Sequence, residues 1–98
     1  MAEMSDNPEL AELRTQIDKV DLGILRLLKV RADIVEKVAD VKVRAGLEPH
    51  QPGRFAELLG RLQLEAANLG LDPLLVEGVW NAIHEDSLAR QAASTIQT

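Results

Sequence analysis

The sequence predicts an all-α fold with three helices, which are long, short and medium in length in that order. Apolar residues recur at alternating intervals of three and four, no run of β-branched residues alternates with period two, and no proline interrupts the periodic segments. The 98 residues are expected to form one domain, residues 1–98, with frayed tails at about 1–6 and 94–98. A domain of this size buries only roughly 60 to 65% of its unfolded surface, so we expect it to need a partner.

The first helix is expected to begin at Pro8, because N-cap residue types precede it and proline fits the first helical turn. The helical pattern continues to about Arg44, and the one internal glycine, Gly23, costs only about 1 kcal/mol relative to alanine. Its apolar positions are Leu10, Leu13, Ile17, Val20, Ile24, Leu27, Ile34, Val38 and Val41. A helix of about 36 residues is about 54 Å long, whereas a globule of this size is about 33 Å across. We therefore expect the apolar face to be buried against a second copy of the chain, which gives an intertwined homodimer.

Glycine and proline separate the other two predicted helices. Residues 45–53 contain two glycines and two prolines and are expected to form a loop. The second helix is predicted over residues 54–68, because Gly70 follows at the place where a left-handed C-cap is needed. Asp72 and Pro73 are an N-cap and first-turn pair, which starts the third helix.

Composition and charge exclude several classes of function. The net charge is −5, with 16 acidic and 11 basic residues, and no run of Lys and Arg exceeds a pair, so a nucleic-acid partner is not expected. The absence of cysteine excludes disulfides and thiolate nucleophiles. No apolar stretch approaches the roughly 20 residues that span a bilayer and no signal segment begins the chain, so we expect no membrane partner and a cytoplasmic location. His50 and His84 lack a second ligand at a recognised spacing and Ser87 lacks a nucleophile elbow, so we expect neither a metal site nor a covalent intermediate.

Three cations lie along a mostly apolar stripe of the first predicted helix: Arg14, Arg31 and Lys42. The last two are eleven residues apart, which places them about 20° apart around the helix and about 16 Å apart along it, so both can line one elongated cavity. Arg14 lies about 100° round and about 25 Å from Arg31, so it joins such a site only from a partner chain. The spacing also fits side chains whose charged ends reach solvent at the edge of a bundle.

Several short motifs together resemble the AroQ family of all-α chorismate mutases. They cover about residues 10–93, and their charged and polar members fall at the family's relative spacings without an insertion. The motifs are Leu13-Arg14-x-x-Ile17-Asp18-x-x-Asp21, Leu27-Leu28-x-x-Arg31, Val38-x-x-x-Lys42, Pro52-x-Arg54, Gly70-Leu71-Asp72 and Ser87-x-x-x-Gln91. The resemblance implies a dimer of three-helix protomers that rearranges chorismate to prephenate without a cofactor or metal.

The resemblance also implies roles for individual residues. Arg14 from the partner chain and Arg31 are expected to hold the two carboxylates of the substrate, while Lys42 and Gln91 donate hydrogen bonds to the ether oxygen whose bond breaks. A Claisen rearrangement moves no proton and needs no nucleophile, so groups that hold the compact conformer and stabilise charge on oxygen are sufficient. Ser87 is expected to support the carboxylate end and Arg54 the loop. The residues expected to bind substrate are these two together with Gln51, Phe55, Val38 and His84.

Two positions depart from the mutase pattern. Gln51 stands where an acid commonly precedes the loop arginine, Phe55 stands where glutamate follows it, and both positions normally help to recognise the ring hydroxyl of the substrate. The loop over 51–54 also resembles that of 4-amino-4-deoxychorismate mutases. An apolar residue at 55 is similar to isochorismate-pyruvate lyases, although Ser87 and Gln91 favour the mutases. A non-enzymatic helical dimerisation module is the remaining alternative, but it would have no reason to place cations in an apolar stripe, where unpaired charge is costly.

Overall fold

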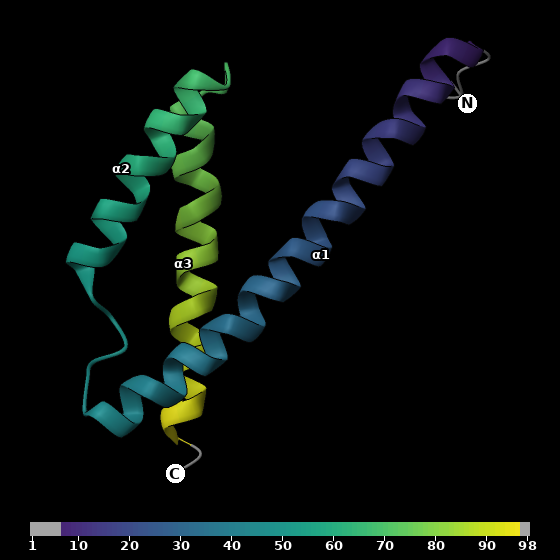
Figure 1. The fold of residues 1–98 in the computed structure, drawn as a ribbon. Helices are drawn as coiled ribbons and strands as arrows, with labels where there is room; N and C mark the ends of the chain where they lie inside the picture. Colours follow the sequence, from purple (N-terminus) through teal and green to yellow (C-terminus); the bar gives the residue numbers. More distant parts are fainter. Residues whose placement is uncertain (1–6, 97–98) are drawn as a thin grey trace. The chain divides into compact units, whose positions relative to one another are not determined.

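The computed structural model describes the backbone of residues 7–96 and the side chains of residues 7–93. It contains three helices, α1 over Pro8–Ala45, α2 over Pro52–Asn68 and α3 over Pro73–Ile96 (Figure 1). No strand occurs within residues 7–96, so the predicted all-α class and the long, short, medium order are confirmed. The predicted tail at 1–6 and the last two residues of the predicted tail at 94–98 lie outside the described residues, whereas the backbone of residues 94–96 belongs to α3, which ends at Ile96. The chain divides into a first unit, residues 1–33, and a second unit, residues 34–98.

The first unit is the N-terminal part of α1. Its N-cap is Asn7, whose Oδ1 accepts hydrogen bonds from the backbone N–H groups of Glu9 (2.9 Å) and Leu10 (3.2 Å). These bonds satisfy two of the amide donors that a helix start leaves unpaired. The helix then continues for 38 residues through Gly23, so the predicted long helix is confirmed.

A glycine turn ends α1 inside the second unit. Gly46 has φ 69°, its N–H donates to the Val43 carbonyl (3.2 Å), and the Leu47 N–H donates to the Lys42 carbonyl (2.8 Å). This pair of bonds is a Schellman motif, which a left-handed residue just beyond the helix end makes possible. The turn reverses the chain within one residue of the predicted end of the helix.

Helices α2 and α3 lie side by side and run in opposite directions (Figure 1). The start of α2 at Pro52 is two residues earlier than predicted, because a proline without an N–H is well suited to the first helical position. The end at Asn68 is as predicted: Gly70 has φ 77° and the turn forms a second Schellman motif. At the start of α3, the Asp72 carboxylate accepts a hydrogen bond from the Leu74 N–H (2.9 Å), so the predicted N-cap is confirmed.

The second unit has a small core built from small residues. Ala39 of α1, Ala66 of α2 and Val76 of α3 are its buried apolar side chains among the described residues. Two polar side chains of α3, Ser87 and Gln91, are buried to the same degree, at 7% exposure each. Because buried polar groups are costly unless they are hydrogen-bonded, these two residues mark the part of the unit where a polar site is built.

Candidate functional site

The centre of the candidate site is a hydrogen-bonded pair formed by Lys42 and Gln91. Lys42 lies in the last turn of α1 and is half-buried, and Gln91 is buried on α3. The Lys42 Nζ donates to the Gln91 Oε1 (2.8 Å) and to the backbone carbonyl of Pro49 (2.8 Å). The structure therefore brings together two predicted catalytic residues that are 49 positions apart in the sequence.

This pairing fixes the orientation of the Gln91 amide. An ammonium group can only donate hydrogen bonds, so the amide oxygen must face Lys42 and the NH₂ group must point away from it. Lys42 has three N–H donors, of which two are directed at Gln91 and Pro49. An ammonium N–H and an amide N–H on two contacting side chains are donor types suited to stabilising negative charge on an oxygen atom.

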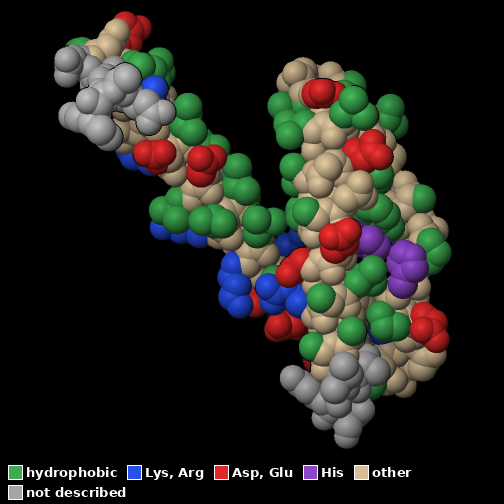
Figure 2. All heavy atoms as spheres, turned by 180° about the vertical axis from the view of Figure 1, so that it is seen from behind, with side chains coloured by type: hydrophobic (Ala, Val, Ile, Leu, Met, Phe, Trp, Pro, Cys, Tyr) green, Lys and Arg blue, Asp and Glu red, His purple; other side chains and the backbone are tan. Residues whose placement is uncertain are grey.

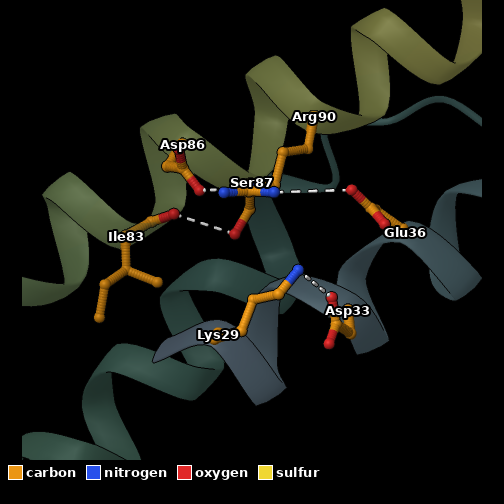
Figure 3. A network of polar contacts seen from close by, with 7 residues as sticks. All are labelled: Lys29, Asp33, Glu36, Ile83, Asp86, Ser87 and Arg90. Atoms are coloured by element: carbon orange, nitrogen blue, oxygen red, sulfur yellow. Dashed lines mark hydrogen bonds and ion pairs between the residues drawn. The ribbon is translucent and has the colours of Figure 1, made fainter. Parts of the chain in front are cut away.

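Three predicted site residues share one face of α3. His84, Ser87 and Gln91 are separated by three and four residues, which places them within an arc of about 60°. The Ser87 hydroxyl donates to the Ile83 carbonyl (2.9 Å), as Figure 3 shows. A serine that bonds back to its own helix keeps acceptor capacity on its oxygen, whereas donation to a substrate carboxylate requires the hydroxyl to rotate.

A cluster of rings lies where the loop, α2 and α3 meet. The ring of Phe55, in the first turns of α2, stacks on the imidazole of His84 with 3.9 Å between centroids and 12° between planes. His50, from the loop before α2, lies 5.4 Å from His84 at 52°. Both Phe55 and His84 were predicted to bind substrate, and the structure places them in contact with each other.

An ion-pair network lies beside Gln91 on α3. The Arg90 guanidinium bonds the Asp86 carboxylate (2.7 Å) and also approaches Glu36 of α1 (3.5 Å), as shown in Figure 3. It thereby connects α3 to the C-terminal part of α1. The Lys29 and Asp33 side chains in the same figure form a separate pair within α1, at 2.8 Å.

Sequence reasoning missed three groups that support the site: Arg90, Glu36 and the Pro49 carbonyl. The spacing of four residues between Asp86 and Arg90 is a local signal that could have been read as a helical ion pair. The contacts of Glu36 and Pro49 carry no local signal, because they depend on how α1 and the loop after it pack in the second unit.

The bonds and ring contacts described above leave out five predicted site residues: Arg14, Arg31, Val38, Gln51 and Arg54. Gln51, Arg54 and Val38 are exposed, and the side chain of Gln51 makes no capping bond at the start of α2. Arg14 is exposed and Arg31 is half-buried, and both lie in the first unit, so their association with Lys42 and Gln91 stays a prediction.

In residues 7–96 no group of three or more His, Cys, Asp or Glu side chains is arranged to hold a metal ion. None of the three helices, over the same residues, is both long enough and apolar enough to cross a membrane.

The candidate site lies within a region that matches a known protein family. The family model for chorismate mutase type II matches residues 13–92, a range that contains every predicted catalytic residue. The chain belongs to the chorismate mutase type II family.

Three relatives each align with most of this chain. A T-protein from Enterobacter agglomerans is 42% identical over 79 residues, which are 81% of this chain and 21% of that protein. The 4-amino-4-deoxychorismate mutase of Streptomyces venezuelae is 31% identical over 80 residues, 82% of this chain and 78% of that one. The isochorismate pyruvate lyase of Pseudomonas aeruginosa is 34% identical over 89 residues, 91% of this chain and 87% of that one. The chain thus spans about a fifth of the length of the T-protein, but most of the length of the other two relatives.

Proposed function

We propose that this protein is a chorismate mutase, which converts chorismate to prephenate by an intramolecular Claisen rearrangement. The observation that carries the proposal is the Lys42–Gln91 pair, in a chain of the chorismate mutase type II family. In this reaction the ether C–O bond breaks while a new C–C bond forms, and negative charge develops on the ether oxygen without any proton transfer. A half-buried ammonium and an oriented amide N–H are suited to that oxygen, because donors fixed in advance need no reorganisation as the charge appears.

The proposed roles of the other residues extend from this centre. One N–H of Lys42 and the NH₂ of Gln91 donate to the ether oxygen, and Ser87, one helical turn away, supports the carboxylate end. Arg31 and the partner's Arg14 bind the two carboxylates, because the planar guanidinium fixes a carboxylate in direction as well as in place. Arg54 supports the loop, and neither a cofactor nor a metal takes part.

We propose further that two copies of the chain form the active unit. Most large apolar side chains of α1 are exposed in the single chain, with exposed fractions from 37% to 70%, and Figure 2 shows hydrophobic side chains along this helix. They are Leu10, Leu13, Ile17, Val20, Leu22, Ile24, Leu25, Leu27, Leu28, Val30, Ile34, Val38, Val41 and Val43. Monomeric proteins seldom expose a contiguous apolar patch larger than roughly a few hundred Å², so we infer that the α1 helix of a second chain covers these side chains. The single domain over residues 1–98 and the cytoplasmic location stay predictions from the sequence.

The first experiment supplies purified protein separately with chorismate, 4-amino-4-deoxychorismate and isochorismate and identifies the products by chromatography. Prephenate from chorismate is the expected result. Turnover of only one of the other two substrates would reassign the activity to that of the relative named for it. Both of those relatives align with most of this chain. No turnover of any substrate, together with unchanged stability in Arg31→Leu, would instead indicate a helical dimerisation module.

A mixing experiment tests whether Arg14 acts across the dimer. Arg14→Ala and Lys42→Ala homodimers are each expected to be inactive. If Arg14 serves the partner's site, a heterodimer has one site with both residues intact, so an equal mixture after subunit exchange regains about a quarter of the wild-type activity per chain. Continued inactivity of the exchanged mixture, with heterodimers shown by mass spectrometry, would place Arg14 outside the partner's site.

A further inference from the structure

We propose that His84 completes a three-ring staple at the start of α2, and that this staple positions Lys42 through the loop before the helix. The three rings are those of His50, Phe55 and His84. His84 is thereby assigned as a positioning residue, which acts through other groups and needs no contact with the substrate. The effect on catalysis rests on the proposed function, whereas the staple is a property of the protein without substrate.

The start of α2 lacks the side-chain cap that the starts of the other two helices have. Asn7 and Asp72 accept hydrogen bonds from backbone N–H groups at the starts of α1 and α3, whereas the side chain of Gln51 accepts none at the start of α2. Loss of a cap destabilises the first turn of a helix, so the entry of the chain into α2 depends on side-chain packing.

The three rings supply that packing. Gln51 is the N-cap, so His50 precedes the cap by one position and Phe55 is the fourth residue of α2. Apolar side chains at these two positions often pack together and fix the angle at which the chain enters a helix, an arrangement called a hydrophobic staple. Here both rings lie against the imidazole of His84 on α3. Phe55 stacks on it, with 3.9 Å between centroids and 12° between planes, and His50 lies at 5.4 Å and 52° (Figure 2 shows the two histidines together).

The burial of His84 suits an anchor. The residue is half-buried, its Nε2 atom is buried, and Phe55 covers one face of its ring. A ring packed in this way has little freedom to move, so it restrains the two rings that contact it. Truncation of His84 to alanine would remove the partner of both other rings at once.

The staple acts on Lys42 through the segment between α1 and α2. Within the part of the chain that the structure describes, no backbone–backbone hydrogen bond involves residues 48–50. The position of the Pro49 carbonyl therefore depends on side-chain contacts: the hydrogen bond from the Lys42 Nζ (2.8 Å) and the ring contact of the next residue, His50. Without the staple this carbonyl is expected to shift, and the ammonium that it accepts from would shift relative to Gln91.

Hydrogen exchange of backbone amides, measured by NMR without substrate, tests the staple. Two amides at each of two helix starts donate to the N-cap carbonyl at 3.0 and 3.3 Å: those of Arg54 and Phe55 in α2, and those of Leu75 and Val76 in α3. His84→Ala is expected to speed exchange of the α2 amides about tenfold and to change the α3 amides less than about twofold. Val76→Ala is the control, since it trims a buried side chain of α3 about 12 Å from His84 along the helix axis. It should speed exchange of the α3 amides and leave the α2 amides unchanged.

Steady-state kinetics with chorismate test the effect on Lys42. His84→Ala should lower kcat about tenfold and change KM less than about threefold, because donors to the ether oxygen act mainly in the transition state. Phe55→Leu also removes the stack and should change exchange and kcat in the same direction. His84→Phe keeps a ring that can stack, so it should restore the exchange of the α2 amides and bring kcat to within about threefold of the wild type. Val76→Ala should leave kcat within about twofold of the wild type.

Each result supports or overturns the inference, with circular dichroism used to establish that the variants fold. Unchanged exchange of the α2 amides in both His84→Ala and Phe55→Leu would overturn the staple and leave the proposed function intact. Faster exchange with an unchanged kcat would overturn the positioning of Lys42. A loss of kcat that His84→Phe does not restore would assign the imidazole to the substrate instead. A wild type that does not turn over chorismate would overturn the proposed function and the positioning role together, while the exchange rates would still decide whether the staple exists.

Discussion

Two glycine turns of the same geometry offer a matched test of how the end of α1 supports the site. Gly46 and Gly70 have φ values of 69° and 77° and form the same two capping bonds, one position after the last residue of α1 and two positions after the last residue of α2. They differ in the residue whose carbonyl accepts the longer-range bond: Lys42 for the turn after α1 and Ala66 for the turn after α2. The perturbation is alanine at each glycine.

The expected loss of stability is the same for both variants. A Cβ added at Gly46 or Gly70 would meet no atom within 4 Å, so no steric clash contributes. Placing an L-residue in the left-handed region costs about 1 to 2 kcal/mol, and the reduced entropy of the unfolded chain offsets about 0.4 to 1 kcal/mol of that cost. Each variant should therefore lose about 1 kcal/mol in the free energy of unfolding, measured by urea denaturation.

The two variants should differ in activity. Strain at Gly46 is relieved by movement of the following loop, whose Pro49 carbonyl accepts a hydrogen bond from the Lys42 Nζ. A displaced acceptor lets the ammonium move away from Gln91, and even small misplacements of a catalytic group are costly in rate. We expect kcat on chorismate to fall about tenfold or more in Gly46→Ala and to change less than twofold in Gly70→Ala. Equal kcat values in the two variants, at equal stability, would refute the idea that this turn positions Lys42.

Two further predictions concern α3. Gln91→Glu keeps an acceptor for Lys42 but loses the amide donor, so kcat should fall about 100-fold at neutral pH. The kcat should rise again when the pH is low enough to protonate the new carboxyl group, whereas full activity at neutral pH would contradict the role of the amide. Arg90→Ala removes two ion pairs, with Glu36 and Asp86, whose side chains are 38% to 60% exposed. The free energy of unfolding should therefore fall by less than about 1 kcal/mol in urea denaturation, and a larger loss would show that the network is needed to hold α1 on α3.

Most of the fold could be predicted from the sequence because its signals are local. Pro8, Pro73 and the two capping glycines mark helix ends through the backbone conformations that these residues favour, and the structure places the four ends that they mark within one residue of the predictions. The apolar spacing in between identifies helices without reference to any other part of the chain. The start of α2 was misplaced by two residues, since Pro52 was assigned to the loop and not to the first helical turn.

For the site, too, the local features could be predicted from the sequence and the tertiary contacts could not. Periodicity placed Lys42 on the apolar stripe of its helix, but only the family resemblance connected it to Gln91, because no spacing rule relates residues on different helices. The Phe55–His84 stack was predicted as two separate substrate-binding residues, and their contact follows from the packing of α2 against α3. A departure from the family pattern at position 55 is therefore not an isolated loss of an acid: the aromatic ring there contacts a histidine on the helix that carries Ser87 and Gln91. Because the two rings are stacked, a substitution at either position is expected to change the surroundings of the other side chain.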